Sequence, residues 1–428
     1  MYKTRYNMLS GFGKMINSSR YSIWYRVQLL SLILIALTLP FSIGINNIAI
    51  GLLVLTWILS GHYKEKFKAA FTNKLCLLFL AVFLIQVIGL FYTSDMKEGL
   101  GKIERKAALF ILPFVLAGLE KLQLKHVHYI VTAFILACTV LSIYALSVLF
   151  INYDLLNFDS GLTEYIDNVI GFHHAYSGMY MVFAVAAALY MAFSKESTWS
   201  RKYRIPFFIV SVLLYSFLVI LAARTAVFTS FLLLFATIIY KVIIYKKLKY
   251  IVGAALVCAV IGLIVLSLPN TKNKIAEFES LRGVHSPFTP RLIKWRCSFK
   301  ILEDQKAWMY GVGTGDVQDH LQVCYTEESF WGDQYLLNAH NEFLEEMARH
   351  GLPGALLFIA SLVFPFVLSI KYKKWLYTLF LTIFMLCSFT ESTLGRQKGV
   401  VFYALFNSVF AFHYLRNQKQ QPEVVSIA

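Results

Sequence analysis

Charged residues are scarce in this sequence: Asp, Glu, Lys and Arg make up only 15% of its 428 residues. A water-soluble domain carries about 25%, whereas 58% of the residues here are hydrophobic and the mean hydropathy is +0.61. Stretches rich in Pro, Gly and Ser, which would separate independently folding units, are also lacking. These absences exclude a soluble globular protein and favour one membrane domain with one inserted segment outside the bilayer.

Cysteine is rare as well, and the six residues fall into two groups. Cys297 and Cys324 lie together in a polar segment and form a disulfide if that segment faces an oxidising compartment, a condition that the spacing leaves open. The other four lie inside apolar runs, where a thiol acts as a small packing group: Cys76, Cys138, Cys258 and Cys387. We find no metal-ligand spacing of useful specificity and therefore expect no metal and no cofactor.

The net charge of +16 raises the question of nucleic acid binding. The basic residues, however, occur in short clusters between apolar runs, for example at 64–68, 246–249 and 371–374. Cytoplasmic loops of membrane proteins are marked in this way. The excess charge therefore predicts orientation in a membrane, and we expect no nucleic acid partner.

Twelve apolar runs approach the length of about 20 residues that a bilayer requires. The loops expected inside the cell are all basic, and those near 153–172 and 391–398 are acidic or mixed. This pattern predicts an all-α polytopic membrane protein with about 12 transmembrane helices and both ends in the cytoplasm. The runs are 27–44, 45–61, 75–92, 107–120, 129–152, 175–194, 205–223, 226–245, 250–268, 353–370, 375–390 and 399–415.

The chain is therefore expected to divide into five segments. These are a cytoplasmic N-terminal segment, nine transmembrane helices, a large loop on the outer side, three more transmembrane helices and a cytoplasmic tail: 1–26, 27–268, 269–350, 351–415 and 416–428. The large loop is predicted to be mainly helical, with helical periodicity at 290–303 and 338–349. Its small core is expected to use Trp295, Trp308, Trp331, Phe343 and Leu344.

Several arginines are candidates for binding an anion. Arg291 and Arg296 belong to a run of basic residues in the large loop, which is either a solvated face or a phosphate site, since guanidinium groups match phosphate oxygens. Arg224 interrupts the apolar stretch 218–235. An arginine at membrane depth costs roughly 2.5–3.5 kcal/mol. We therefore expect Arg224 to face a polar cavity or a ligand, the alternative being a turn at the membrane surface.

His340 is the candidate base. With Asn341 it lies in a helix predicted at about 339–349, which would end at Gly351, a residue type common just beyond helix ends. The chain is expected to re-enter the membrane after Pro353, so His340 would lie close to the outer membrane surface. An imidazole there can take a proton from a hydroxyl group near neutral pH. A purely structural role for this loop histidine is the alternative.

Further polar residues are expected on the same side. His173 and His174 begin the sixth apolar run and either line the same cavity or lie at the interface. Glu391 and Arg396 flank the last outer loop, as an ion pair or as part of the site. The sequence GVGTG at 311–315 lacks the strand–turn–helix context of a dinucleotide site and predicts a flexible turn.

At these residues the chain resembles the O-antigen ligase family, whose membrane core is shared with O-antigen polymerases and protein O-oligosaccharyltransferases. The family pattern is His-Asn, nine residues, then Gly-x-x-Gly, and it is present here as His340-Asn341 and Gly351-Leu-Pro-Gly354. Arg291 in PRLIKW, the GVGTG turn and Arg224 in ARTA resemble the segments that surround this pattern. The resemblance is strong over about residues 205–415. In the first half it concerns mainly the layout, together with the sequence GLGKIERKAALFILP at 99–113.

The resemblance implies metal-independent glycan transfer at the periplasmic face of the bacterial inner (cytoplasmic) membrane. The donor would be an undecaprenyl-diphosphate-linked O-antigen or polysaccharide, and the favoured acceptor a hydroxyl group of lipid A–core. Arg224 and Arg291 would bind the donor diphosphate, and His340 would be the general base of a reaction that inverts the anomeric carbon. Residues expected to line the site besides these are Asn341, His173, His174, Arg296, Glu391 and Arg396.

Other functions remain open at this stage. Within the same fold, an O-antigen or exopolysaccharide polymerase and a protein O-oligosaccharyltransferase differ from a ligase only in the acceptor. A transporter of lipid-linked glycans would show internal repeats and charged or broken helices near the membrane midplane. Here the notable polar residues gather at one side, which favours an enzyme over a transporter or a non-catalytic assembly protein.

Overall fold

The computed structural model describes residues 21–152, 162–221, 223–245 and 289–415. Within these ranges the chain forms helices and no β-sheet, which confirms the all-α expectation. The expected run 250–268, most of 1–26 and the tail 416–428 lie outside the described residues. The side chain of Arg224 also lies outside them, although Arg224 begins a described helix.

A helix is present at each of the other eleven expected apolar runs. The long apolar stretches favour helices because an apolar environment offers no water to satisfy the backbone N–H and C=O groups. The eleven helices are α2 (Ile23–Thr38), α3 (Ile43–Leu59), α5 (Lys74–Gly89), α7 (Ala108–Gly118), α8 (Leu124–Ile151), α10 (His174–Phe193), α11 (Arg204–Ile220), α12 (Arg224–Tyr245), α17 (Glu342–Lys371), α18 (Trp375–Ser388) and α19 (Gln397–Tyr414).

The remaining elements are short helices that connect or cap these. They are α4 (Tyr63–Thr72), η1 (Leu90–Tyr92), α6 (Met96–Lys106), α9 (Leu162–Ile170), η3 (Arg201–Tyr203), α15 (Thr289–Asp304), α16 (Val317–Glu327) and η4 (Trp331–Tyr335). Among the described residues, five helices are long and apolar enough to cross a membrane, or six if α3 and α4, which meet at 118°, form one span. The protein is thus a multi-pass membrane protein, and the count of twelve spans stays a prediction.

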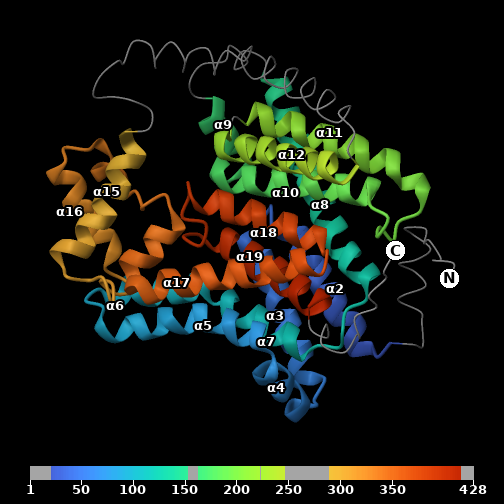
Figure 1. Ribbon diagram of the computed structural model, residues 1–428, viewed down its shortest axis with the longest axis horizontal. Coiled ribbons are helices and arrows are strands. Elements are labelled where there is room, and N and C mark those ends of the chain that lie inside the picture. The colour runs from blue at the N-terminus through green and yellow to red at the C-terminus, as the bar shows by residue number, and fades with distance from the viewer. Residues whose placement is uncertain (1–20, 153–161, 222, 246–288, 416–428) are drawn as a thin grey trace.

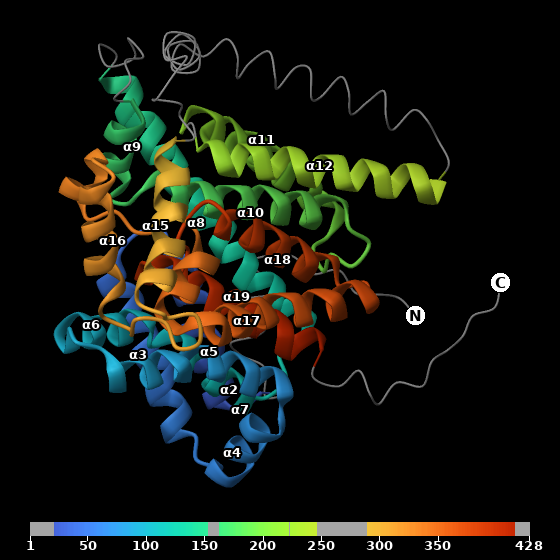
Figure 2. The same cartoon turned by 60° about the vertical axis from the view of Figure 1, so that its left-hand side comes forward.

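The long helices run beside one another, and α15, α16 and α6 gather at one end of this bundle (Figures 1 and 2). The first turns of α17 reach into the same region. At His350 and Gly351 the backbone of α17 leaves helical geometry, which divides the helix into a polar first part and an apolar second part. We call α15, α16, η4 and the first part of α17 the lobe.

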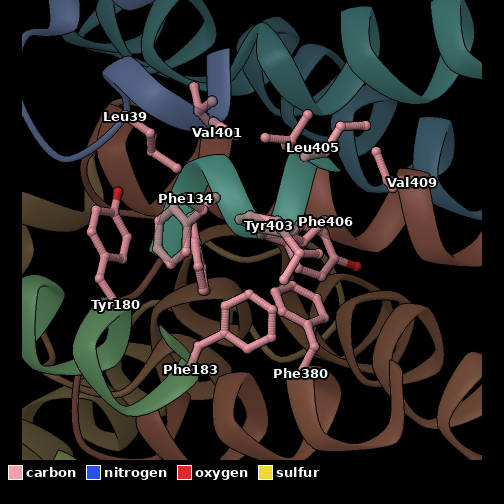
Figure 3. Close-up of a cluster of buried hydrophobic side chains, with 14 of the residues drawn as sticks. Leu39, Phe134, Tyr180, Phe183, Phe380, Val401, Tyr403, Leu405, Phe406 and Val409 are labelled. Atoms are coloured by element: carbon pink, nitrogen blue, oxygen red, sulfur yellow. The ribbon is translucent and has the colours of Figure 1, made fainter. Parts of the chain in front are cut away.

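The core of the bundle surrounds α19, whose side chains are buried almost all around. Phe406 packs edge-on against Phe134 of α8 and Phe183 of α10, with ring centroids 5.1 and 5.0 Å apart, and also contacts Phe380 of α18 (Figure 3). In a membrane such van der Waals packing holds helices together, because the lipid tails are as apolar as the side chains. The central position of α19 fixes the loop that leads into it from α18.

The lobe has a small core of its own, and Cys297 of α15 and Cys324 of α16 form a disulfide within it. Two of the expected core residues were wrong, because Trp308 and Trp331 are 37% and 57% exposed, whereas Leu344 packs against a second small cluster. Tyr325 and Phe330 are the aromatic side chains inside the lobe. The core consists of Cys297, Ile301, Val317, Leu321, Cys324, Tyr325, Phe330 and Ala348.

Candidate active site

His340 lies in the turn that leads into α17. Its backbone has a φ of +46°, a conformation that is uncommon for residues other than Gly and in which Asn, Asp and His are enriched. The Asn338 side chain accepts the His340 N–H at 3.0 Å, and Asn341 caps α17 by accepting the N–H groups of Phe343 and Leu344 at 3.0 and 3.1 Å. The Asn of the His-Asn pair is thus the helix cap that fixes the turn carrying the imidazole.

Glu391 is the partner of His340. It lies in the loop between α18 and α19, and its Oε2 atom is 3.2 Å from Nδ1 of the imidazole. Burial raises the pKa of Glu391, but the positive electrostatic contributions of His340, His173 and Lys294 outweigh burial and lower this pKa to about 2. The carboxylate is therefore ionised at any physiological pH and binds the Nδ1–H group of His340. This leaves Nε2 of the imidazole as the acceptor.

His173 and His174 lie at the start of α10, next to this pair. The His173 side chain accepts the Ala175 N–H at 3.3 Å, and His174 Nδ1 is 2.8 Å from Oδ2 of Asp167. Burial and the neighbouring His174 lower the pKa of His173 to about 4, so it is neutral near pH 7. Donor atoms of Asp167, His173 and His174 lie within 4.8 Å of one another, a group that could hold a metal ion.

The basic residues of α15 divide between two faces. Lys294 is buried and lies within the electrostatic range of Glu391, and Arg291, three residues earlier on the same helix, also influences its charge. Arg296 is 71% exposed and pairs with Glu328 of the lobe at 3.2 Å. Among the described contacts, none joins Arg296 to His340 or Glu391.

The start of α12 also reaches this site. Thr225, the residue after Arg224, lies with its hydroxyl 2.8 Å from the hydroxyl of Thr390, which precedes Glu391. Arg224 thus follows the turn after α11, at the end of the bundle that carries His340. Glu391 pairs with His340, and among the described ion pairs it has no contact with Arg396, which is exposed at the start of α19.

A buried charge network, which the sequence did not reveal, supports both loops of the site. Four side chains on one face of the first part of α17 are fully or almost fully buried: Glu342, Glu345, Glu346 and Arg349. Arg349 pairs with Glu345 at 2.6 Å and with Glu346 at 3.1 Å, and Glu346 pairs with Lys106 of α6. The regular spacing of these charges could have indicated a shared face, since residues three and four apart are neighbours on a helix.

This network binds the backbone on both sides of the His340–Glu391 pair. Glu345 accepts the N–H group of Ala339, which precedes His340, at 3.1 Å and contacts the Ser392 hydroxyl at 3.5 Å. Glu342 accepts the N–H group of Leu394 at 2.7 Å. Because Glu345 is held by the buried Arg349 and contacts both loops, it fixes the two loops relative to each other.

The glycines of the family pattern permit close backbone approach. Gly351 has a φ of +66°, and a Cβ atom there would lie 2.5 Å from the carbonyl carbon of Met309. At Gly311 a Cβ atom would lie 2.2 Å from the carbonyl carbon of Arg349. The 311–315 turn also donates hydrogen bonds to the chain around it, such as Val312 N–H to Ala348 O at 2.9 Å. The expectation of a flexible turn was wrong, because the turn is packed between α17 and the end of α5.

An apolar groove with a volume of about 850 Å³ runs between α10, α11 and α12. Val219 and Ile220 line the end nearest to the start of α12, and Phe193 and Phe208 line the other end. The groove therefore extends from the level of the site along the apolar helices. Its lining is largely apolar, which suits contact with hydrocarbon chains.

Residues 209–359 match the model of a family described as O-antigen ligase. The chain carries an O-antigen ligase domain. The match confirms the family to which the sequence pattern pointed, whereas no curated protein matches the chain.

The O-antigen ligase domain extends from within α11 to within α17 and includes Arg224, Arg291 and His340. The family implies glycan transfer of the O-antigen ligase or polymerase kind. Glu391 and His173 lie outside the matched residues. The packing of α10 and α19 against the domain brings these two residues to the site.

Proposed function

We propose that this protein transfers an O-antigen or polysaccharide from an undecaprenyl-diphosphate carrier to an acceptor hydroxyl group, with lipid A–core as the acceptor. The proposal places the reaction on the periplasmic face of the bacterial inner membrane and requires no metal. The observation that supports it is the His340–Glu391 pair, with the buried Lys294 within the electrostatic range of Glu391. A base beside cations suits a reaction that deprotonates an alcohol and releases a diphosphate.

The proposed reaction is a single displacement. Nε2 of His340 takes the proton of the acceptor hydroxyl, whose oxygen attacks the anomeric carbon. The bond from that carbon to the diphosphate oxygen breaks, and the electron pair leaves with the diphosphate. Attack opposite to the leaving group inverts the anomeric carbon. Glu391 holds the imidazole in the required tautomer and stabilises the imidazolium that forms.

The cations of the site supply the electrostatic part of the mechanism. Negative charge grows on the diphosphate as the bond breaks, and fixed guanidinium groups stabilise it without a reorganisation of solvent. We assign this role to Arg291 and Arg224. A lipid-linked donor is further supported by the apolar groove, because a polyprenyl chain can lie in it while the diphosphate reaches the start of α12.

The product of the purified protein tests this function. The protein in nanodiscs receives a defined undecaprenyl-diphosphate-linked glycan and, in separate reactions, lipid A–core, a second lipid-linked glycan or an acceptor protein. Extension of lipid A–core with an inverted linkage is expected. Transfer only to the second glycan or to protein would replace the ligase assignment with a polymerase or a protein oligosaccharyltransferase. Movement of an intact donor across a vesicle, without transfer, would contradict the enzyme.

Substitution of Glu391 tests the pairing with His340. In Glu391→Gln we expect a transfer rate lower by about 10²–10⁴-fold, because the amide no longer stabilises the imidazolium. The pKa of Glu391 is about 2, so its own titration does not shape the acidic limb of the pH–rate profile. Transfer by Glu391→Gln at the wild-type rate would contradict the pairing.

The Cys297–Cys324 disulfide tests the location of the lobe. Disulfides persist in the periplasm and are rare in the cytoplasm. Mass spectrometry of non-reduced peptides should detect the disulfide in protein from normal cells. In protein from cells without periplasmic thiol oxidase, the disulfide should be absent. The double variant with Ser at both positions serves as the control. Thiols that remain reduced in normal cells would contradict a periplasmic lobe.

A further inference from the structure

Four lysines among the described residues have buried side chains, and they differ in what holds their ammonium groups. Burial of a charge is unfavourable unless hydrogen bonds or opposite charges replace water. Three of the four have such partners: Lys66 binds Trp57 O and Ser60 Oγ, Lys106 binds Gln86 and Glu346, and Lys398 binds Pro40 O and Phe41 O.

Lys294 is the exception. Its side chain is 5% exposed, but within the described part of the chain no hydrogen bond and no ion pair to its ammonium group is found. The ring of Phe330 lies beside it, with its centroid 5.9 Å from Nζ. The negative charge of Glu391 favours the charged form of Lys294, but the carboxylate of Glu391 is bound to His340 at 3.2 Å. The ammonium group thus faces the site with capacity for an anion.

The electrostatics agree with this geometry. Burial lowers the pKa of Lys294 to about 8, with Arg291 on the same helix adding to the effect and Glu391 from the α18–α19 loop opposing it. His340 and His173 also lie close to Glu391, on the same side as Lys294. An anion that bound here would restore the preference of Lys294 for its charged form.

We propose that Lys294 binds phosphate oxygens of the donor diphosphate, beside Arg291. This inference rests on the proposed function. Phosphate oxygens could also come from a phosphorylated acceptor or from a phospholipid headgroup. The donor is favoured because its diphosphate is bonded to the reacting carbon and must therefore lie in the pocket of His340 and Glu391. The phosphates of an acceptor can be many bonds away from its reacting hydroxyl.

Because the charge of Lys294 depends on pH, donor binding should weaken as the pH rises. The free enzyme holds the proton on Lys294 below about pH 8 and loses it above. Because only the ammonium form attracts the diphosphate, the KM for the donor should rise as the pH increases from 7 through 8 to 9.5. The KM for the acceptor should stay constant over the same range.

The experiment compares three variants in nanodiscs with undecaprenyl diphosphate as the binding probe. Lys294→Met should weaken probe binding and raise the donor KM by about 10–100-fold, as expected for hydrogen bonds to a charged group. Lys294→Arg keeps the charge at all these pH values and should remove the rise of the donor KM. Lys300→Met is the matched control, because Lys300 is on the same helix and its partner is Glu327 at the surface.

Each result has a defined meaning. Wild-type affinity and a wild-type donor KM in Lys294→Met would overturn the inference, as would an effect confined to the acceptor KM. The Lys294→Met variant and the wild type are also compared in nanodiscs of different lipids. If the variant binds the probe more weakly only in nanodiscs with anionic phospholipid, and as well as the wild type in phosphatidylcholine, the site binds a lipid headgroup and the inference is overturned. If Lys294→Met fails to fold, the pH profile of Lys294→Arg decides. Absence of probe binding and of transfer in the wild type would instead remove the proposed function.

Discussion

Replacement of His340 is expected to abolish most of the transfer activity, with a rate lower by about 10²–10⁴-fold, the usual contribution of a positioned base. The expectation follows from the geometry, in which Glu391 occupies Nδ1 and leaves Nε2 for the acceptor. His340→Asn is the informative variant. Asparagine tolerates the positive φ of this position but cannot act as the base. Alanine would add backbone strain to the loss of the imidazole.

The assay for His340 is initial-rate transfer with a defined donor at saturating acceptor, together with donor binding. Donor binding should remain close to that of the wild type, because the base does not bind the diphosphate. His320→Ala is the control, since His320 lies on α16 of the lobe and is not in contact with the Glu391 loop among the described interactions. Transfer by His340→Asn at the wild-type rate would refute the assignment of the base.

The second large effect is expected at Arg291. If two of its N–H groups bind phosphate oxygens in parallel, lysine cannot replace it, because an ammonium group lacks the planar fork. Both Arg291→Ala and Arg291→Lys should therefore lower kcat/KM for the donor by about 10²–10³-fold, similar to the loss of one fixed donor at a developing charge.

The control for Arg291 lies on the same helix. Arg296→Lys should retain activity, because Arg296 is 71% exposed and pairs with Glu328. Steady-state kinetics over a range of donor concentrations distinguish the variants, and thermal unfolding in detergent verifies that they fold. Full activity of Arg291→Lys would eliminate bidentate binding, and a point charge would then be sufficient at this position.

The apolar runs of the sequence predicted the described helices closely, because span length and helical periodicity are local properties of the chain. The α15 helix at Thr289–Asp304 and the start of α17 at Glu342 also agree with the predicted periodicity. The prediction failed for the core of the lobe. Large aromatic side chains were expected inside it, but two indole rings are exposed and a disulfide occupies the interior.

The site could be predicted only in part. His340 was identified from a local pattern, and the structure explains its neighbours: Asn341 caps α17, and Gly351 allows the break in that helix. The partner of Glu391 was not predicted, since the sequence left open an ion pair with the nearby Arg396 or a place in the site lining. The buried network of Glu345 and Arg349 was also missed, because its charges are indistinguishable in sequence from those of a solvated helix face.

By itself, the sequence determined that this protein is a helical membrane protein with the motif of an O-antigen ligase domain, because apolar length and the His-Asn/Gly-x-x-Gly spacing are short-range features. Tertiary structure alone decided that Glu391 meets His340 across 51 residues and that Lys294 is buried without a partner among the described residues. These contacts depend on how α19 and α15 pack against α17. Such long-range packing is set by the shapes of many side chains together, which no single segment of the chain encodes.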